Sequence, residues 1–247
     1  MERFLRTVKL LGNEAVDKLK DSRVVLAGLG AVGSFAAEAL ARSGVGSFVL
    51  VDFDTVHITN INRQIYALES TIGKKKTEVA KERILDINPK AEVIPLDMFI
   101  EGGALDRIFL HEPDLIIDAI DSLGPKADLL SQAVKRKIPV LSSMGAALKS
   151  DPAKIQTADL FQTSNCSLAK QIRRMLRKRG ISEGVQCVYS SEPPKKEAIT
   201  EVEKEKDRKG NRAMRKAQVL GSLNTITGIF GLTLAHEGLK ILTEQQK

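Results

Sequence analysis

The sequence has few residues of the kinds that build metal centres and disulfide frameworks. Only two of its 247 residues are cysteines, Cys166 and Cys187, and they form no C-x-x-C pair. The three histidines, at 57, 111 and 236, show no metal-ligand spacing. No charged-then-apolar segment typical of a secretion signal stands at the N-terminus. We therefore expect no structural zinc site, and we expect the reducing cytoplasm as the location.

Positive charge is concentrated late in the chain. Residues 164–216 hold fifteen Lys and Arg against seven Asp and Glu, whereas the rest of the chain holds twenty-three against twenty-four. A localised basic surface favours a polyanionic partner, and nucleic acid is the commonest one. The alternative is a solvated segment of mixed charge.

Apolar runs alternate with helical patterns through residues 1–143. A helical pattern over 1–22 is followed by strands predicted at 24–28, 48–52, 92–96, 114–119 and 138–142, with helices at 32–43, 75–88, 101–110 and 125–136. This alternation predicts a doubly wound α/β fold, with a mostly parallel, Rossmann-like sheet covered on both faces.

The pattern changes in the second half, residues 144–247. Strands are predicted at 155–160 and 185–190, around a basic helix over 166–179 that Ser164 or Asn165 would cap. Residues 192–216 hold Pro193-Pro194 and many charges, which predicts a mobile surface loop. The apolar stretch 222–242 approaches membrane-span length, but its polar residues and glycines favour a buried closing helix. We expect one domain, with this half as a C-terminal basic extension.

A glycine motif in the first half predicts a nucleotide site. The apolar run from Val24 ends in G-x-G-x-x-G, formed by Gly28, Gly30 and Gly33. Nineteen residues after the last glycine, a second apolar run ends in Asp52. In a βαβ unit the glycines permit a tight turn and close phosphate approach, the helix N-terminus faces the phosphate, and the acid accepts hydrogen bonds from a ribose.

Three further features favour ATP with Mg²⁺ over a dinucleotide. Arg63, within T-N-I-N-R-Q, offers planar two-pronged stabilisation of charge that develops on phosphate. Lys76 adds a point charge at the start of a helix, and acids after the apolar run 115–117 stand where a carboxylate can hold Mg²⁺. The alternatives are that Asp118 and Asp121 cap the next helix and that Lys76 belongs to a solvated helix start.

Taken together, these motifs resemble the ubiquitin-activating-enzyme-like adenylation superfamily, which includes the bacterial activators of sulfur-carrier proteins. The similarity lies in G-L-G-A-V-G, D-F-D, T-N-I-N-R-Q, the lysine after I-G, and D-A-I-D-S. Within that superfamily the chain is most similar to the tRNA threonylcarbamoyladenosine dehydratases, through G-V-G at 44–46, I-N-P at 87–89, P-K-A at 125–127 and G-V-Q-C-V-Y-S at 184–190. The resemblance spans nearly the whole chain and implies a single adenylation domain.

The resemblance also implies a set of site residues. It assigns the phosphates to the three glycines, Asn60, Arg63 and Lys76, the ribose to Asp52, and Mg²⁺ to Asp121. The nucleotide-binding set further includes Asp54, Asn62, Gln64 and Ser122. The N-terminal R-F-L-R resembles the R-x-x-R of sulfur-carrier activators, in which the second arginine enters the partner subunit's site. Arg6 is therefore expected to act catalytically, with Arg63, Lys76 and Asp121, in a homodimer.

The activity implied by the resemblance is ATP-dependent cyclisation of N6-threonylcarbamoyladenosine in tRNA. ATP would adenylate the threonyl carboxylate, and the neighbouring ureido group would attack the activated carbonyl and release AMP. Such a reaction needs no protein nucleophile, so we expect no covalent role for Cys166 or Cys187. A sulfur-transfer partner of the cysteine-desulfurase type is left open, and no membrane association is expected.

Three other functions remain open at this point. The chain could adenylate the C-terminal glycine of a ubiquitin-like sulfur-carrier protein, although the zinc-binding C-x-x-C pairs common in those activators are absent. It could be an NAD-binding dehydrogenase or redox sensor, which has no use for Arg63 and Lys76. It could also be an idle adaptor that binds a nucleotide and a partner protein.

Overall fold

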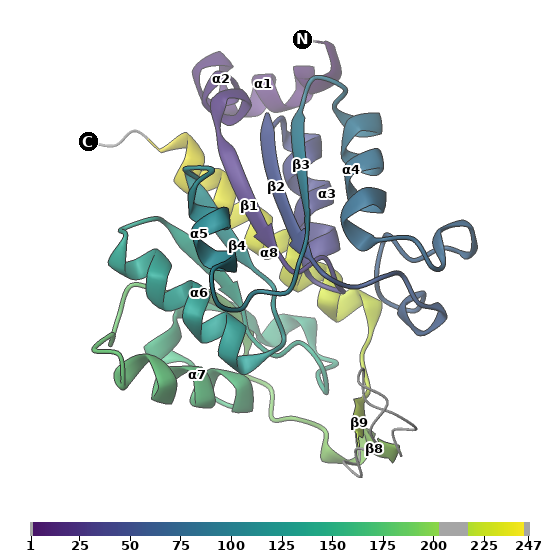
Figure 1. Ribbon diagram of the computed structural model, residues 1–247, viewed down its shortest axis with the longest axis vertical. Coiled ribbons are helices and arrows are strands. Elements are labelled where there is room, and N and C mark those ends of the chain that lie inside the picture. The colour runs from purple at the N-terminus through teal and green to yellow at the C-terminus, as the bar shows by residue number, and fades with distance from the viewer. Residues whose placement is uncertain (1, 203–216, 245–247) are drawn as a thin grey trace.

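A seven-stranded sheet forms the centre of the computed structural model, which describes residues 2–202 and 217–244 (Figure 1). The strand order is β3–β2–β1–β4–β5–β7–β6. The strands are β1 (Arg23–Ala27), β2 (Ser47–Asp52), β3 (Glu92–Asp97), β4 (Leu115–Asp118), β5 (Val140–Ser143), β6 (Ile155–Asp159) and β7 (Gln186–Ser190). All neighbouring pairs are parallel except the pair of β7 with the edge strand β6. The predicted doubly wound, mostly parallel sheet is confirmed.

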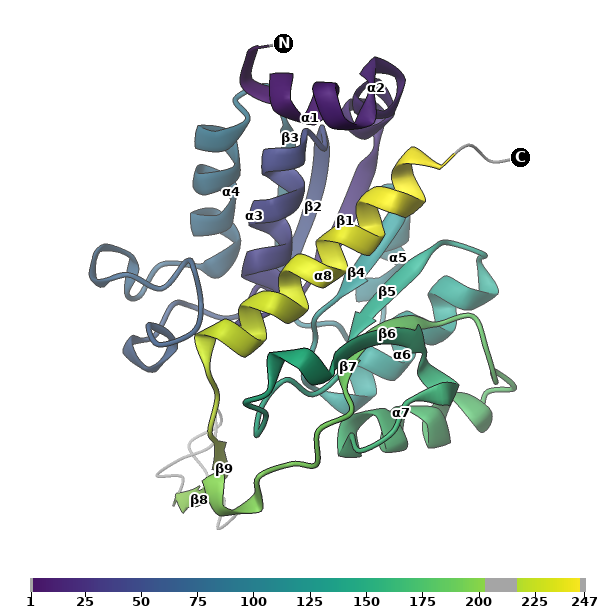
Figure 2. The ribbon, with the colours of Figure 1, turned by 180° about the vertical axis from the view of Figure 1, so that it is seen from behind.

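Helices cover both faces of this sheet. They are α1 (Leu5–Leu11), α2 (Asn13–Asp21), α3 (Gly33–Ser43), α4 (Lys76–Ile87), α5 (Ala104–Phe109), α6 (Leu123–Lys135), α7 (Ser167–Arg177) and α8 (Asn224–Thr243). Single 3-10 turns lie at Glu2–Phe4, Ile58–Asn60, Glu69–Thr71, Pro152–Lys154, Leu160–Gln162 and Lys196–Ala198. Helices α5, α6 and α7 lie on the face seen in Figure 1, and α3, α4 and α8 cover the face seen in Figure 2.

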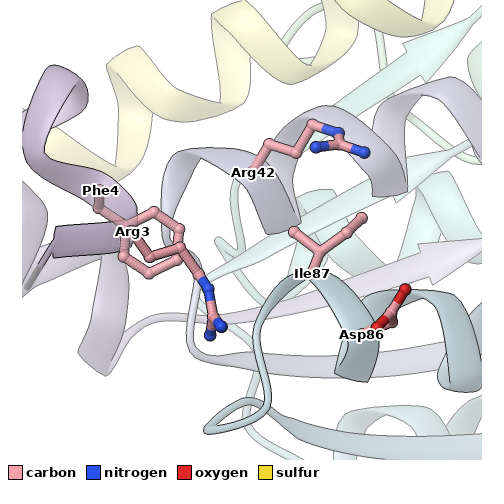
Figure 3. A pocket seen from close by; sticks show the side chains of 5 residues that line it. All are labelled: Arg3, Phe4, Arg42, Asp86 and Ile87. Atoms are coloured by element: carbon pink, nitrogen blue, oxygen red, sulfur yellow. The ribbon is translucent and has the colours of Figure 1, made fainter.

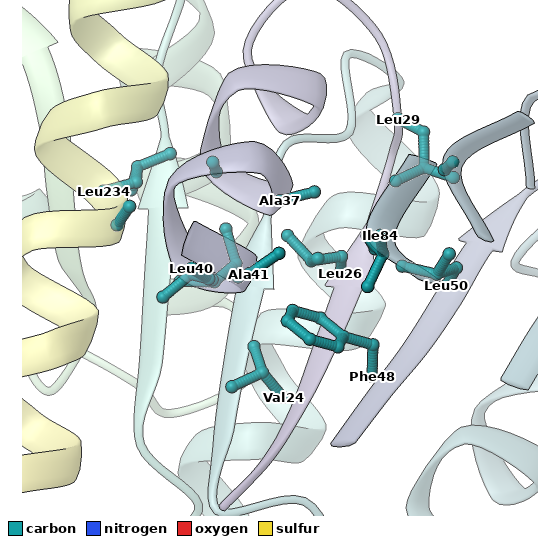
Figure 4. Packing of buried hydrophobic residues seen from close by; sticks show 14 of the residues in the cluster. Val24, Leu26, Leu29, Ala37, Leu40, Ala41, Phe48, Leu50, Ile84 and Leu234 are labelled. Carbon is teal, nitrogen blue, oxygen red and sulfur yellow. The ribbon is translucent and has the colours of Figure 1, made fainter. Parts of the chain in front are cut away.

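Successive side chains of the central strands point to opposite faces of the sheet, so the core has two layers. In β1, Val24 and Leu26 pack with Leu40 of α3 and Leu234 of α8 (Figure 4). The intervening Val25 and Ala27 belong to the layer under α5, α6 and α7. All of these side chains are fully buried, because a central parallel strand is covered on both faces. This explains why the strands read as continuous apolar runs.

Helix α8 closes one face at very short range. Ile226, Phe230 and Leu234 are buried on the sheet side. A Cβ atom at Gly231 would lie 2.4 Å from the carbonyl oxygen of Val32, so only glycine allows this approach to α3. The predicted buried closing helix is confirmed. No helix within residues 2–202 and 217–244 combines the length and apolar character needed to cross a bilayer.

Three local predictions are wrong. The N-terminal helix breaks in two at Gly12, where φ is +85° and ψ is 164°. The cap of the basic helix is Cys166, because Asn165 takes a left-handed conformation and donates its amide to the carbonyl of Ser191. Part of the predicted loop 192–216 is a strand, β8 (Ile199–Val202), which pairs antiparallel with β9 (Ala217–Leu220). The rest of that predicted mobile loop, 203–216, lies outside the described residues.

Candidate nucleotide site

The glycine motif forms the turn between β1 and α3. Gly28 has φ of +91°, and a Cβ atom there would lie 2.7 Å from the carbonyl oxygen of Ala119. A Cβ atom at Gly33 would lie 1.8 Å from the carbonyl oxygen of Gly28. Gly30 is different, because its nearest neighbour is the Gln64 side chain, 3.8 Å from where a Cβ atom would be. The loop is therefore tight where it packs on β4 and open at Gly30, beside the N-terminus of α3.

Asp52, the last residue of β2, is connected directly to this loop. Its Oδ2 accepts a hydrogen bond from the Leu29 N–H at 2.7 Å, and its Oδ1 accepts one from the Asp54 N–H at 2.9 Å. Burial raises the pKa of the Asp52 carboxyl, while the nearby charge of Lys76 opposes that rise. A carboxylate has about four lone-pair sites, so both oxygens retain capacity to accept hydrogen bonds from a ribose.

Lys76 is not a solvated residue at a helix start, so that alternative is excluded. Its side chain is 6% exposed, and its Nζ lies 3.2 Å from Oδ2 of Asp54. The backbone adds a second link, because the N–H of Lys76 donates to the carbonyl of Asp54 at 3.1 Å. The first turn of α4 is therefore held against the end of β2, where the ammonium stands beside two carboxyl groups.

The segment 57–64 carries the predicted arginine on a compact loop. Nη1 of Arg63 donates to the Thr59 carbonyl at 2.8 Å and to Oδ1 of Asn62 at 2.9 Å. Asn60 accepts from the His57 N–H at 3.0 Å, and Asn62 donates to the Ser222 carbonyl at 3.4 Å. The two asparagines thus shape the loop, whereas Nε and Nη2 of Arg63 make no hydrogen bond within the described residues.

Gln64 ends this loop in a buried position. Only 7% of the residue is exposed, and its Nε2 is the atom that faces Gly30. Its Oε1 has no hydrogen-bond partner among the residues that the structure describes. Buried polar atoms are normally satisfied, and an unmet acceptor beside an open glycine is what a ligand with donor groups would complete.

The two acids at the carboxyl end of β4, Asp118 and Asp121, have different roles. Asp118 is fully buried, with its Oδ2 2.7 Å from Nζ of Lys126 and accepting the Ser142 hydroxyl at 2.6 Å. Asp121 is exposed, and its carboxylate accepts the Ser122 hydroxyl at 3.2 Å. Neither acid caps α6, whose N-cap Ser122 makes no side-chain cap bond, so the capping alternative is wrong. Because Asp118 is neutralised by Lys126, Asp121 is the carboxylate of this pair that can hold a cation.

Lys126 supports the candidate site, and the sequence motifs did not assign it this role. Its Nζ also donates to the Ile120 carbonyl at 2.9 Å, while Asp118 accepts the Ile120 N–H at 3.1 Å. The pair thus holds the turn that leads to Asp121. The available signal was a lysine at a core position of a helix, since Leu129, Leu130 and Ala133 follow at helical spacing and are buried with it.

These groups converge at one edge of the sheet. The glycine loop, Asp52 and Asp121 follow the carboxyl ends of β1, β2 and β4, which are adjacent strands. Strand order reverses between β1 and β4, and open α/β sheets bind ligands at such a switch point. The structure therefore brings together twelve predicted residues from four separate segments, 28–33, 52–64, 76 and 121–122, counted with the loop-shaping asparagines but without Arg6.

Arg6 does not join this group within one chain. Helix α1 lies at the amino edge of the sheet, opposite the glycine loop (Figure 1). Phe4 fixes that placement, because its ring lies 3.6 Å from the position of a Cβ atom at Gly44, just before β2. A hollow of about 340 Å³ opens at the same edge between Arg3, Phe4, Arg42, Asp86 and Ile87 (Figure 3). It is remote from the nucleotide residues and is no part of their site.

The cysteines are placed differently from each other. Cys187 is fully buried in β7, as predicted, and burial raises the pKa of its thiol to about 12. Cys166 is partly exposed and accepts the Ala169 N–H through Sγ at 3.5 Å. Within the described residues, no group of three or more His, Cys, Asp and Glu side chains is arranged to hold a metal ion.

Comparison with known proteins identifies the architecture. The model of the ThiF family matches residues 2–247. The chain is 48% identical over 194 residues to the tRNA threonylcarbamoyladenosine dehydratase of Bacillus subtilis, covering 78% of this chain and 76% of that protein. It is 36% identical over 249 residues to the enzyme of the same name from Escherichia coli, covering 97% and 92%. The crystal structure of the E. coli tRNA N6-threonylcarbamoyladenosine dehydratase in complex with ATP superposes with a TM-score of 0.87, at 34% identity, covering 98% of this chain and 93% of that one. The resemblance read from the motifs is confirmed: the chain belongs to the ThiF family.

Proposed function

We propose that this chain is an ATP-dependent tRNA threonylcarbamoyladenosine dehydratase. The observation that carries the proposal is the convergence of the glycine loop, Asp52, Arg63, Lys76 and Asp121 at one switch point of the sheet. The similarity to two dehydratases, one of them over 97% of this chain, supports the same activity. A homologous crystal structure that contains ATP supports ATP as the nucleotide.

The geometry supports a different role for each of these groups in binding ATP. The open backbone at Gly30 and the N-terminus of α3 suit the phosphates, and Asp52 suits the ribose. The buried Lys76 ammonium, already 3.2 Å from a carboxylate, and the Arg63 guanidinium supply positive charge where the leaving pyrophosphate develops negative charge. Asp121 would hold Mg²⁺, which neutralises phosphate charge when bound.

The reaction then balances without a protein nucleophile. An oxygen of the threonyl carboxylate attacks the α-phosphorus of ATP, and pyrophosphate leaves. The ureido group of the same nucleoside attacks the activated carbonyl, its proton is lost to solvent, and AMP leaves as the ring closes. The buried, high-pKa thiol of Cys187 is consistent with this direct route.

A role for Arg6 at a nucleotide site requires two copies of the chain to associate. Helix α1, which contains Arg6, lies at the amino edge of its own sheet (Figure 1), so Arg6 can reach a nucleotide site only in a second copy of the chain. We therefore propose a homodimer in which Arg6 serves the partner's site. Cytoplasmic location and a sulfur-transfer partner of the cysteine-desulfurase type are further parts of the proposal.

AMP release separates this proposal from its rivals. Purified protein with ATP and Mg²⁺ is given tRNA that carries N6-threonylcarbamoyladenosine, the same tRNA without the modification, a ubiquitin-like carrier protein, or no substrate. We expect AMP and cyclised nucleoside only with the modified tRNA. AMP formation with the carrier protein alone would favour the carrier activator, and nucleotide binding with no turnover on any substrate would favour the adaptor.

Calorimetry provides the test against a dehydrogenase. Arg63, Lys76 and Asp121 suit a triphosphate and its metal, so we expect ATP with Mg²⁺ to bind and NAD not to bind. Tight NAD binding without ATP binding would overturn the nucleotide assignment.

A further inference from the structure

Helix α7 presents an uncompensated row of positive charge. The nineteen residues 164–182 contain six Lys and Arg and no Asp or Glu. Ala169, Ile172 and Leu176 anchor the helix in the core, and all three are buried. The opposite side of the helix therefore faces solvent, and it carries Lys and Arg but no acidic residue.

Two of the six cations serve the fold rather than the surface. Arg173 is partly buried and donates to the carbonyls of Leu160 and Thr163 at 3.2 Å each, and also to the Thr163 hydroxyl. Arg179 pairs with Asp128 of α6. Helical spacing alone would place Arg173 near the exposed cations, but its guanidinium instead closes the turn at 160–163.

The remaining four cations form a continuous stripe. We define the basic stripe as Lys170, Arg174, Arg177 and Lys178, all of which are exposed. Their spacing of four, three and one residues places them along one side of the helix over about 12 Å of its axis. Among the residues that the structure describes, none of the four forms an ion pair with an acid. The Arg177 guanidinium lies 5.4 Å from the centre of the Phe161 ring, which orients it.

The stripe begins near the carboxyl edge of the sheet, where the proposed nucleotide site lies. A Cβ atom at Gly145, just after β5, would lie 3.5 Å from Sγ of Cys166, the N-cap of α7. Strand β5 pairs in parallel with β4, whose carboxyl end leads to Asp121. The first turn of α7 is therefore next to the strand neighbouring the proposed metal acid, and helix α7 runs from there beside α6 (Figure 1).

From this placement we propose that the basic stripe docks the phosphate backbone of the substrate tRNA beside the nucleotide site. The inference rests on the proposed function, which supplies tRNA as the polyanion. An anionic membrane is the less suitable partner, since interfacial helices also insert large apolar side chains. Within residues 160–182, all described, no large apolar side chain is exposed. Charge without apolar anchors is typical of backbone recognition in nucleic acids.

Salt titration of tRNA binding tests the stripe. The variant Arg174→Gln with Lys178→Gln removes two charges and leaves the buried face of α7 intact. The matched control is Lys9→Gln with Lys20→Gln, which removes two exposed charges at the amino edge. Each lost phosphate contact lowers the slope of log affinity against log salt by about 0.7–0.9. We expect the stripe variant to bind more weakly at low salt with a slope smaller by roughly 1.5, and the control to match the wild type.

ATP affinity and the thermal unfolding midpoint, measured on all three proteins, should be unchanged. An unchanged slope in the stripe variant, with tRNA binding by the wild type intact, would overturn the docking surface and leave the dehydratase proposal standing. Equal loss in stripe variant and control would also overturn it, because only overall charge would then matter. Failure of the wild type to bind modified tRNA at any salt concentration would overturn both.

Discussion

Lys126 and Asp118 lie 2.7 Å apart, from Nζ to Oδ2, and neither side chain is exposed to solvent. The same ammonium binds the Ile120 carbonyl and the same carboxylate binds the Ile120 N–H. One ion pair thus fixes both sides of the turn that precedes Asp121. Because the pair is buried, removal of only one partner leaves an uncompensated charge in the core and lowers the stability of the fold.

We predict that Lys126→Met lowers the free energy of unfolding by about 3–5 kcal/mol, because it leaves a buried carboxylate without its cation. Adding Asp118→Asn to that variant should restore part of the loss, since no charge then remains uncompensated. Urea unfolding at neutral pH measures both. A single variant as stable as the double variant would contradict the assigned role of the pair.

Arg63→Ala and Asp121→Ala should each reduce AMP formation by about 10²–10³, because each removes one charge contact from a preorganised site. Both side chains are at least partly exposed, so the unfolding midpoint should not change. Arg107→Ala and Asp17→Ala, which alter exposed residues outside the site, are the matched controls. Near-normal turnover in either site variant would remove that residue from the catalytic assignment.

Neither cysteine should be needed for activity. Cys187→Ala should cost about 1 kcal/mol of stability, since it removes a fully buried side chain, and Cys166→Ala should cost less. Both folded variants should still cyclise modified tRNA. Loss of activity in a folded variant, together with a thioester trapped on the wild-type protein, would show that a covalent step exists.

Glu38 should make stability depend on acid pH. Burial raises the pKa of its carboxyl, but hydrogen bonds and charges from Arg83 and Arg42 outweigh burial and leave the pKa below its usual value of 4.5. The distances are 2.5 Å to Nε of Arg83 and 2.6 Å to Nη2 of Arg42. A lowered folded-state pKa means that the stabilisation is complete above about pH 4.5 and is lost as the pH falls through the folded-state value.

Glu38→Gln should therefore lower the free energy of unfolding by about 1–2 kcal/mol at pH 7, and the difference from wild type should shrink below pH 4. The loss is this small because solvent screens the charges of both arginines, whose side chains are 60% and 40% exposed. Chemical denaturation at several pH values gives the curve, with exposed Glu183→Gln as control. A difference that persists undiminished in acid would mean that packing, rather than charge, is lost.

The central strands of the sheet could be predicted because they are buried on both faces and thus appear as uninterrupted apolar runs. The pair β8 and β9 could not, since each strand is four residues long and lies among charged residues, and each depends on pairing with a segment remote in sequence. The break at Gly12 was missed for a related reason. Apolar spacing continues across it, and only the backbone angles reveal two helices.

The site residues could be named from motifs because strand ends and glycine turns have strong local signals. The local pattern alone did not distinguish Asp118 from Asp121, and only the resemblance chose Asp121, because the difference depends on Lys126, one helical turn into α6, pairing with Asp118. Arg173 illustrates the same difficulty on the surface, because Arg174 beside it is exposed whereas Arg173 itself binds carbonyls of the preceding turn. The division of the chain at residue 143 stays a prediction, although strands from both halves share the sheet.

The close fit of α8 against β4, β5 and α3 affects folding of the nascent chain during synthesis. A Cβ atom at Gly238 would lie 2.9 Å from Leu115, so this helix leaves no gap above the sheet. Ribosomes deliver residues in order, and about a hundred residues separate the end of β5 at Ser143 from the end of α8 at Thr243. At synthesis rates of about 5–20 residues per second, the part of the apolar face of β4 and β5 that α8 covers stays open for roughly 5–20 seconds. During that interval the half of the chain that carries the nucleotide residues is the part most in need of a chaperone.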